Sequence, residues 1–187
     1  MPARRKSRSR AVHVAPATIA RRELLVGESD ATFREFIHGL LAFSERVIAV
    51  REGFGQVIGL SGIQYTVLVS IAHLQDREEV SIGTIAAHLH FSGAFITTVT
   101  NQLQRLGLID KARSKQDRRK ANLVTTDEAD RLLERLAPVQ REVNDALFAP
   151  LSRAQFVEFA RQMDGLVEAG DKAIALLAYL RSTRKAG

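Results

Sequence analysis

A dense cluster of charge occupies residues 115–120, which read KQDRRK. One carboxylate, Asp117, is followed directly by the cations Arg118, Arg119 and Lys120. The flanking stretches LIDKARS and ANLV alternate as β-strands do, so the cluster is predicted to form the tip of a hairpin. Arginines at such a tip suit the narrow A·T-rich minor groove of DNA, whose negative potential attracts them. The competing interpretation is a hairpin tip with merely solvated charges.

Each side chain of the tip has an expected role. Asp117 would be repelled by DNA on its own, so we expect it to hold an arginine in a fixed pose through a bidentate pair. Arg119 is expected to enter the minor groove, and Arg118 or Lys120 to bind the phosphate backbone. The hairpin residues expected to contact DNA are Arg113, Lys115, Asp117, Arg118, Arg119 and Lys120.

A second polar group lies on the segment just before the hairpin, FSGAFITTVTNQLQRLGLI. Its apolar residues recur at helical intervals and are Ile96, Val99, Leu103 and Leu106. Ser92 is the predicted N-cap, and Gly107 the left-handed residue past the end. The other face carries hydrogen-bonding side chains instead of the Glu–Lys pairs that support a merely solvated helix.

That polar face has the side chains that reading a DNA major groove requires. Asn101 and Gln102 are the types suited to adenine, and Arg105 to guanine or a phosphate. Thr97 and Thr98 suit a phosphate or a thymine methyl group. Ser92 and the free amides at the helix start suit a phosphate. We expect two or three of these six to touch bases.

The segments before this one complete a DNA-binding unit. A helix is predicted from Ser81 to residue 90, and its near-direct junction with the helix over 92–106 is typical of a helix-turn-helix. The stretch SGIQYTVLVSIAHL opens with Ser61 and Gln64 at capping-box spacing, which predicts another helix. Residues 60–125 are therefore expected to be a winged helix-turn-helix, with its wing at 109–124.

Further helices flank this unit. One is predicted over residues 31–52 and ended by Gly53. A long helix is expected to start at the capping-box pair Thr125 and Glu128. Pro138 inside it predicts a kink or a break.

A final helix, predicted from Ser152, is also apolar along one stripe. The apolar stripes of this helix and of the other flanking helices are too extensive to remain exposed to solvent. A winged helix of about 65 residues has little surface with which to cover them. A second copy of the chain is the simplest cover, and a two-fold dimer would supply two recognition helices. The alternative is one monomeric helical core. We expect a mainly α fold in which dimerisation helices at 31–54 and 126–187 flank the winged lobe.

Charge and composition narrow the function classes. Residues 1–22 hold seven cations and no acid, and residues 92–120 hold seven cations against two acids, within a total net charge of +6. Clustered cations on an acidic body favour a polyanion partner, although a solvated loop and a disordered tail would also explain them. Residues 1–30 are expected to be a basic, flexible arm that adds phosphate contacts or reaches a minor groove. A transit peptide is the weaker interpretation.

Several activities are disfavoured. The chain has no cysteine, which excludes thiolate chemistry and fits a reducing, cytoplasmic location. No apolar run approaches the roughly 18 residues of a membrane span. The five histidines lack metal-binding spacing, so neither a metal nor a cofactor is expected. No nucleophile–base pair or phosphate-binding glycine loop is recognisable, so an enzyme is the weak alternative.

Taken in order, these elements resemble the MarR family of bacterial transcriptional regulators over roughly residues 31–180. The triplet at 117–119 matches the family's wing signature, Asp-Arg-Arg followed by a short strand and Leu-Thr-x-x-Gly. Thr126 falls at the signature threonine, whereas Thr125 and Ala129 replace the leucine and the glycine. LQRLGLI resembles the end of the family's recognition helix, and SGIQYTVLVSIAHL its second helix.

The resemblance implies a homodimer that binds a pseudo-palindromic operator and usually represses nearby genes. It also implies release by a small, often aromatic, anionic effector bound between the dimerisation helices and the DNA-binding lobe. His38, Arg46 and Tyr65 are polar residues on otherwise apolar helices near that junction, so they are candidate effector ligands, or equally buried or rim residues. Without cysteine, ligand gating is the remaining switch. The competing class is a constitutive architectural DNA-binding protein without an effector.

Overall fold

The computed structural model describes residues 16–113 and 121–184, and the side chain of Arg113 is not among those described. The interpretations of residues 1–15 and of the hairpin tip, including Lys115, Asp117, Arg118, Arg119 and Lys120, lie outside these ranges.

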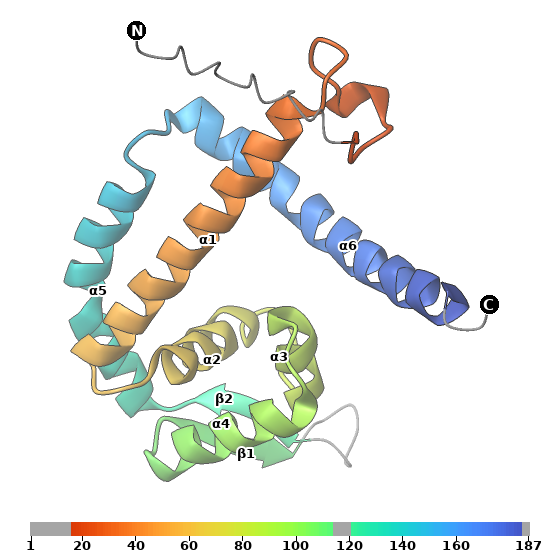
Figure 1. The fold of residues 1–187 in the computed structure, drawn as a ribbon. Coiled ribbons are helices and arrows are strands. Elements are labelled where there is room, and N and C mark those ends of the chain that lie inside the picture. The colour runs from red at the N-terminus through yellow and green to blue at the C-terminus, as the bar shows by residue number, and fades with distance from the viewer. Residues whose placement is uncertain (1–15, 114–120, 185–187) are drawn as a thin grey trace, which may run out of the picture.

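The winged helix-turn-helix predicted from the sequence is present. Its helices are α2 (Gly62–Leu74), α3 (Ile82–Leu89) and α4 (Gly93–Arg105). The antiparallel strands β1 (Ile109–Arg113) and β2 (Ala121–Thr125) follow directly and form the wing. These five elements gather at one end of the molecule (Figure 1).

Local capping chemistry sets the lobe's helix boundaries. The Ser61–Gln64 capping box is formed in both directions. Ser81 and Ser92 cap the next two helices by accepting backbone N–H groups. Gly107 has φ +70°, the left-handed conformation that ends α4 and sends the chain into the wing. The caps predicted for these three helices are confirmed.

A hydrophobic core joins the helices of the lobe to its hairpin. Its fully buried large side chains are Leu68, Ile71, Ile85, Ile96, Leu103, Ile109 and Leu123. Burying each such side chain contributes about 1.5–3 kcal/mol. Leu123 also ties β2 to the loop before α3, because its N–H donates to the Val80 carbonyl at 2.7 Å. The recognition helix is therefore held by packing on its apolar side, which leaves its polar side outward.

Three helices flank the lobe: α1 (Ala31–Val57), α5 (Asp127–Phe148) and α6 (Arg153–Arg184). Helix α5 packs beside α1, and α6 crosses the N-terminal half of α1 and then projects as an arm (Figure 1). A second buried cluster, of Phe54, Tyr65 and Leu136, joins α1, α2 and α5. This cluster is the junction between the lobe and the flanking helices.

Two predicted boundaries are wrong. Helix α1 does not stop at Gly53 but continues to Val57, because a glycine inside a helix costs only about 1 kcal/mol. Thr126, and not Thr125, caps α5, its Oγ1 accepting the Ala129 N–H at 3.3 Å. The Thr125 hydroxyl is already engaged, since it accepts from Gln75 Nε2 at 2.8 Å.

Helix α5 passes through Pro138 without a break. The proline has no N–H, so the helix loses one internal hydrogen bond there. Of the two outcomes left open by the sequence, the break is therefore excluded.

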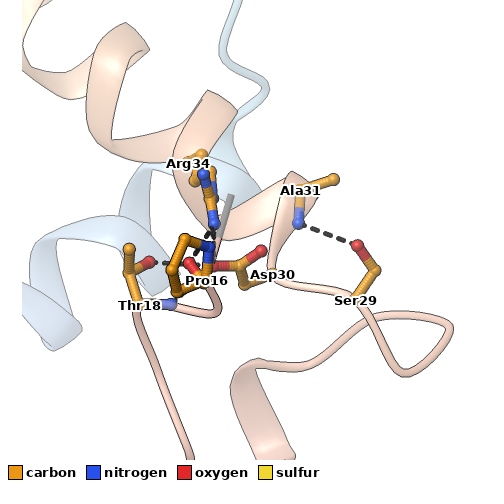
Figure 2. A network of polar contacts seen from close by, with 6 residues as sticks. All are labelled: Pro16, Thr18, Ser29, Asp30, Ala31 and Arg34. Atoms are coloured by element: carbon orange, nitrogen blue, oxygen red, sulfur yellow. Dashed lines mark hydrogen bonds and ion pairs between the residues drawn. The ribbon is translucent and has the colours of Figure 1, made fainter. Parts of the chain in front are cut away.

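Residues 16–30, expected to be part of a flexible arm, are bound to the start of α1. They contain a short 3₁₀ helix (Arg22–Leu24) and a bridge between Val26 and Ser29. Asp30 Oδ2 accepts the Thr18 N–H at 2.7 Å and the Thr18 hydroxyl at 2.9 Å, and it pairs with Arg34 at 2.9 Å (Figure 2).

The arginine of this group reaches one residue further back, donating from Nη2 to the Pro16 carbonyl at 2.7 Å (Figure 2). We call Pro16, Thr18, Asp30 and Arg34 the Asp30 latch. The Thr18 amide hydrogen bond, followed by the Arg34 bond, lowers the pKa of Asp30 to about 2. The latch ties Pro16 and Thr18 to the start of α1.

Candidate nucleic-acid interface

The polar face of α4 is on the outside of the lobe. Ala94, Thr98, Asn101 and Arg105 recur at intervals of four, three and four residues and so form one line along the helix. Three of them are exposed, and Asn101 is half-buried. This line faces away from the core side of α4.

A hydrogen bond connects this face to the wing. The Lys111 ammonium on β1 donates to Asn101 Oδ1 at 2.5 Å. Lys111 lies opposite Leu123 in the hairpin, whereas Asn101 is on α4. The bond therefore joins the hairpin to the helix. The base of the wing and the polar face of α4 are therefore adjacent parts of one surface, as a shared DNA contact requires.

The start of α2 holds the other flank of α4. Gln64 accepts the Ser61 N–H at 2.9 Å through Oε1 and donates to Gln102 Oε1 from Nε2 at 3.1 Å. The side chain that caps α2 thus also positions a residue of the recognition helix. The sequence did not predict Gln64 or Lys111 as residues of this surface, because their partners lie 38 and 10 residues away.

The hydroxyls on α4 are partly engaged. Thr97 donates to the Gly93 carbonyl at 2.7 Å, and Thr98 donates to the Ala94 carbonyl at 3.2 Å. With its proton used in this way, each threonine offers a methyl group and an acceptor oxygen outward, which suits thymine better than phosphate.

The two ends of α4 each offer hydrogen-bond donors to a ligand. Ser92 Oγ accepts the Phe95 N–H at 3.3 Å and keeps its own proton as a donor. Arg105 is exposed and has no hydrogen bond or ion pair to any described residue, so its guanidinium is available for an anion or a base edge.

Two apolar features of this surface were missed or misjudged. Phe91 and Phe95 are 44% and 41% exposed, and their ring centroids are 5.1 Å apart. Because they lie beside the recognition face, they are candidates for contacts with thymine methyl groups. The sequence could have indicated their exposure, because both lie outside the apolar stripe of α4 that faces the core. Leu106, predicted to lie on the apolar face, is 53% exposed because α4 ends before it.

The candidate effector ligands are not brought together. Tyr65 is buried in the junction cluster, and its hydroxyl accepts from Gln140 Nε2 at 2.7 Å. Arg51 lies over the Tyr65 ring at 5.3 Å and donates to Thr66 Oγ1 at 2.9 Å. The tyrosine is thus a satisfied core residue that links α2 to α5.

His38 is exposed on the N-terminal half of α1, and Arg46 is exposed just past its middle. Arg46 donates back to the Ala42 carbonyl of its own helix at 2.6 Å. At about 1.5 Å of rise per residue, His38 lies roughly 24 Å along α1 from Phe54, the residue that touches Tyr65. In the described part of the chain, no three His, Asp or Glu side chains are grouped so as to hold a metal.

Much of the apolar surface of the flanking helices is uncovered. The exposed large apolar residues of α1 and α6 are Phe36, Leu40, Leu41, Ile48, Val57, Phe156, Val157, Leu166, Val167, Ile174, Leu176, Leu177, Tyr179 and Leu180. A wholly apolar groove of about 460 Å³ runs between α1 and α6, with Phe43, Phe148 and Phe159 in its walls. No single helix of the described residues has the length and apolar composition to cross a membrane.

With this geometry in view, the comparisons with known proteins identify the lobe. Residues 58–120, from just after α1 to the residue before β2, match the model of the MarR family. This lobe belongs to the MarR family. MarR proteins are DNA-binding transcription regulators, which agrees with an exposed polar recognition helix beside a wing. No functionally curated protein matches the sequence.

Solved MarR structures share the fold. A MarR protein from Peptoclostridium difficile has a TM-score of 0.59 at 17% identity, covering 80% of this chain and 94% of its own. Staphylococcus aureus MepR, in a complex with DNA, has 0.56 at 17%, covering 80% and 99%. Bordetella bronchiseptica BpsR, whose DNA binding is regulated by 6-hydroxynicotinic acid, has 0.55 at 20%, covering 69% and 90%. The predicted fold class is thereby confirmed.

Proposed function

We propose that this MarR protein is a sequence-specific repressor that acts in the cytoplasm as a homodimer on a pseudo-palindromic operator. The observation that carries the proposal is the Lys111–Asn101 bond, because it makes the recognition face of α4 and the base of the wing one surface. One helix fits the major groove while an adjoining wing reaches the neighbouring minor groove. MepR, which shares this fold, forms a complex with DNA, and this supports DNA binding by the present chain.

The homodimer is supported by the uncovered apolar residues of α1 and α6. Exposed apolar patches of this extent mark association surfaces, and the groove beside Phe43 and Phe159 is lined by apolar side chains apart from Ser44. A second copy has matching α1 and α6 stripes to fill it, in a two-fold arrangement. Two recognition helices would then meet two half-sites one helical turn of DNA apart.

For the wing tip, the proposed roles are those the sequence indicates. Arg119 enters the minor groove, Arg118 or Lys120 binds the backbone, and Asp117 orients an arginine. Arg119→Ala should weaken operator binding at least about threefold, which is roughly half of the 1.4 kcal/mol that corresponds to a tenfold change. A loss of operator affinity smaller than about threefold would contradict the placement of Arg119 in the minor groove.

The basic segment at residues 1–15 is proposed to add phosphate contacts. The Asp30 latch attaches it at the start of α1, about 40 Å of helix away from α2, and fifteen extended residues span up to roughly 50 Å. Deleting residues 1–15 while keeping the latch should flatten the salt dependence of DNA binding. An unchanged slope would show that the segment has no DNA role.

Release by a small effector is the regulatory part of the proposal. It is supported by BpsR, whose binding to DNA responds to 6-hydroxynicotinic acid. An effector would act by binding better to a conformation that does not fit DNA. The alternative function is a constitutive architectural protein, which would coat DNA broadly in a footprint, whereas a regulator would protect one short inverted repeat.

The decisive experiment selects DNA from a random pool with the full chain and measures affinity for the selected sequence. Arg105→Ala should weaken binding about tenfold or more and reduce the salt slope by about one. Arg161→Ala, on α6 and paired with Glu158 at 2.7 Å, removes the same charge away from the lobe and should leave affinity unchanged. Equal effects of the two variants, or no enriched sequence, would contradict the proposed function.

A further inference from the structure

The two amide side chains of the recognition face both have their oxygen occupied within the protein. Asn101 Oδ1 accepts from Lys111 Nζ at 2.5 Å. An ammonium group has donors and no acceptor, so Asn101 must turn its oxygen toward Lys111. The hydrogen-bond chemistry itself fixes which end of this amide faces outward.

The orientation of Gln102 is fixed by a relay of two bonds. Gln64 Oε1 accepts the backbone N–H of Ser61 at 2.9 Å, which leaves Gln64 only its Nε2 group to offer. That Nε2 donates to Gln102 Oε1 at 3.1 Å. Gln102 therefore turns its oxygen toward Gln64 of α2.

The groups left outward are N–H donors. Neither Asn101 Nδ2 nor Gln102 Nε2 has a partner among the described residues. No side-chain nitrogen or oxygen of the described residues is buried without a partner, so Nδ2 of the half-buried Asn101 is open to solvent. Arg105, one turn further along the same face, offers donors only.

We propose that Asn101 and Gln102 act on DNA as hydrogen-bond donors alone. With Arg105, they make the C-terminal half of α4 a reader of base edges that only accept hydrogen bonds. Guanine offers two such acceptors, N7 and O6, against the single O4 of thymine, so guanine is the preferred base. Reading adenine with an amide needs the oxygen for the N6 amino group and an N–H for N7. Here each amide oxygen is turned toward a donor of the protein, Lys111 Nζ or Gln64 Nε2. This replaces the sequence-based expectation that these amides read adenine, and it rests on the proposed DNA-binding function.

Lys111 and Gln64 are the positioning residues of this arrangement. Neither has to touch a base, because each acts by occupying an amide oxygen. Gln64→Glu keeps an acceptor for the Ser61 N–H, so the cap of α2 survives. It removes the donor, so Gln102 should rotate, donate to the new carboxylate and turn its own oxygen outward.

The first test uses base analogues in the DNA selected by the wild-type full chain. Replacing a half-site guanine by 7-deazaguanine should weaken binding about tenfold, and this loss should vanish in Asn101→Ala or Gln102→Ala. Replacing any half-site adenine by a purine without the N6 amino group should cost less than about threefold. Two results would overturn the inference. One is a loss of affinity of about tenfold on removing an adenine N6 amino group that disappears in Asn101→Ala or Gln102→Ala. The other is that neither variant changes the loss of affinity caused by 7-deazaguanine.

The second test is the base preference of variants. Gln64→Glu and Lys111→Met should each move the selected base at one half-site position away from guanine toward adenine or cytosine, the bases with amino groups. Gln56→Glu and Lys172→Met, which change the same charges elsewhere, should leave the preference unchanged. A uniform loss of affinity without a new preference would show a merely structural role for Lys111 and Gln64.

The two levels of proposal fail differently. If the wild-type chain enriches no sequence from the pool, the DNA-binding function itself is wrong. If it enriches a sequence whose adenine amino groups are read by Asn101 or Gln102, the function stands and only the donor-only assignment falls.

Discussion

At the residue scale, the contacts that a side chain can offer depend on which of its atoms already form hydrogen bonds within the protein. The type of Asn101 suggested adenine, but its bond to Lys111 leaves a donor facing the solvent. The type of Tyr65 suggested an effector ligand, but its hydroxyl is bonded to Gln140 inside the core. Residue identity sets the possible contacts, and neighbours from distant segments decide which of them remain.

The Asp30 latch gives a residue-scale prediction about pH. Its carboxylate has a folded-state pKa of about 2, below the ordinary value near 4. The ionised form is therefore favoured by folding, so the latch contribution is fully present above pH 4 and is lost as the pH falls toward 2. Protection of the Thr18 amide from hydrogen exchange should decline across that window.

A pair of variants isolates this effect. Asp30→Ala should abolish Thr18 protection already at pH 7, whereas Asp171→Ala, an exposed acid on α6, should preserve it. Full Thr18 protection in Asp30→Ala would mean that the latch does not hold residues 16–30.

At the element scale, close backbone approach sets the angle between α1 and α2. A Cβ at Gly55 would lie 2.8 Å from the Leu60 carbonyl oxygen and 2.9 Å from the Ser61 carbonyl carbon, both of them backbone atoms. At Gly53, two residues earlier in the same helix, a Cβ would meet nothing within 4 Å. At Gly55 the absence of a side chain therefore permits close packing of backbone, whereas at Gly53 glycine only destabilises the helix.

This contrast predicts opposite signs for two alanine substitutions. Gly55→Ala should lower the free energy of unfolding by about 1–3 kcal/mol, because backbone must move to admit the methyl group. Gly53→Ala should raise it by up to about 1 kcal/mol through helix propensity. Urea denaturation at one fixed protein concentration measures both, and a stabilising Gly55→Ala would contradict the close approach.

At the scale of the whole molecule, one protomer leaves its longest helix largely uncovered. Helix α6 spans 32 residues and has no buried side chain, yet Ile174 and Leu177 are 50% and 58% exposed. An isolated helix with such a stripe is not stabilised by tertiary packing. The proposed homodimer supplies that packing.

Charge introduced into the stripe should dissociate the dimer. The double variant Ile174→Glu with Leu177→Glu is expected to shift the sedimenting mass from twice 20.7 kDa toward 20.7 kDa. The same charges at Lys172 and Thr183, on the opposite side of α6, should leave the mass unchanged. In a monomer all four positions would be ordinary surface sites, and neither variant would change the mass.

The sequence by itself determined the local elements of this protein. The serines at 61, 81 and 92, the glycine at 107 and the helical spacing of apolar residues predicted the lobe, because caps, turns and amphipathic faces depend on residues within a few positions of one another. The end of α1 was misplaced because a glycine inside a helix costs only about 1 kcal/mol. The cap of α5 was misplaced because Thr125 is engaged by Gln75 from fifty residues away.

Only the tertiary structure decided how the polar residues can be used. Gln64 and Gln102 are 38 residues apart, and Tyr65 and Gln140 are 75 apart, so no local pattern signals their bonds. Side-chain type fixes an inventory of donors and acceptors, whereas packing determines which of them are consumed inside the protein. The sequence thus predicted a DNA-binding face, and the fold decided which hydrogen-bonding groups that face presents.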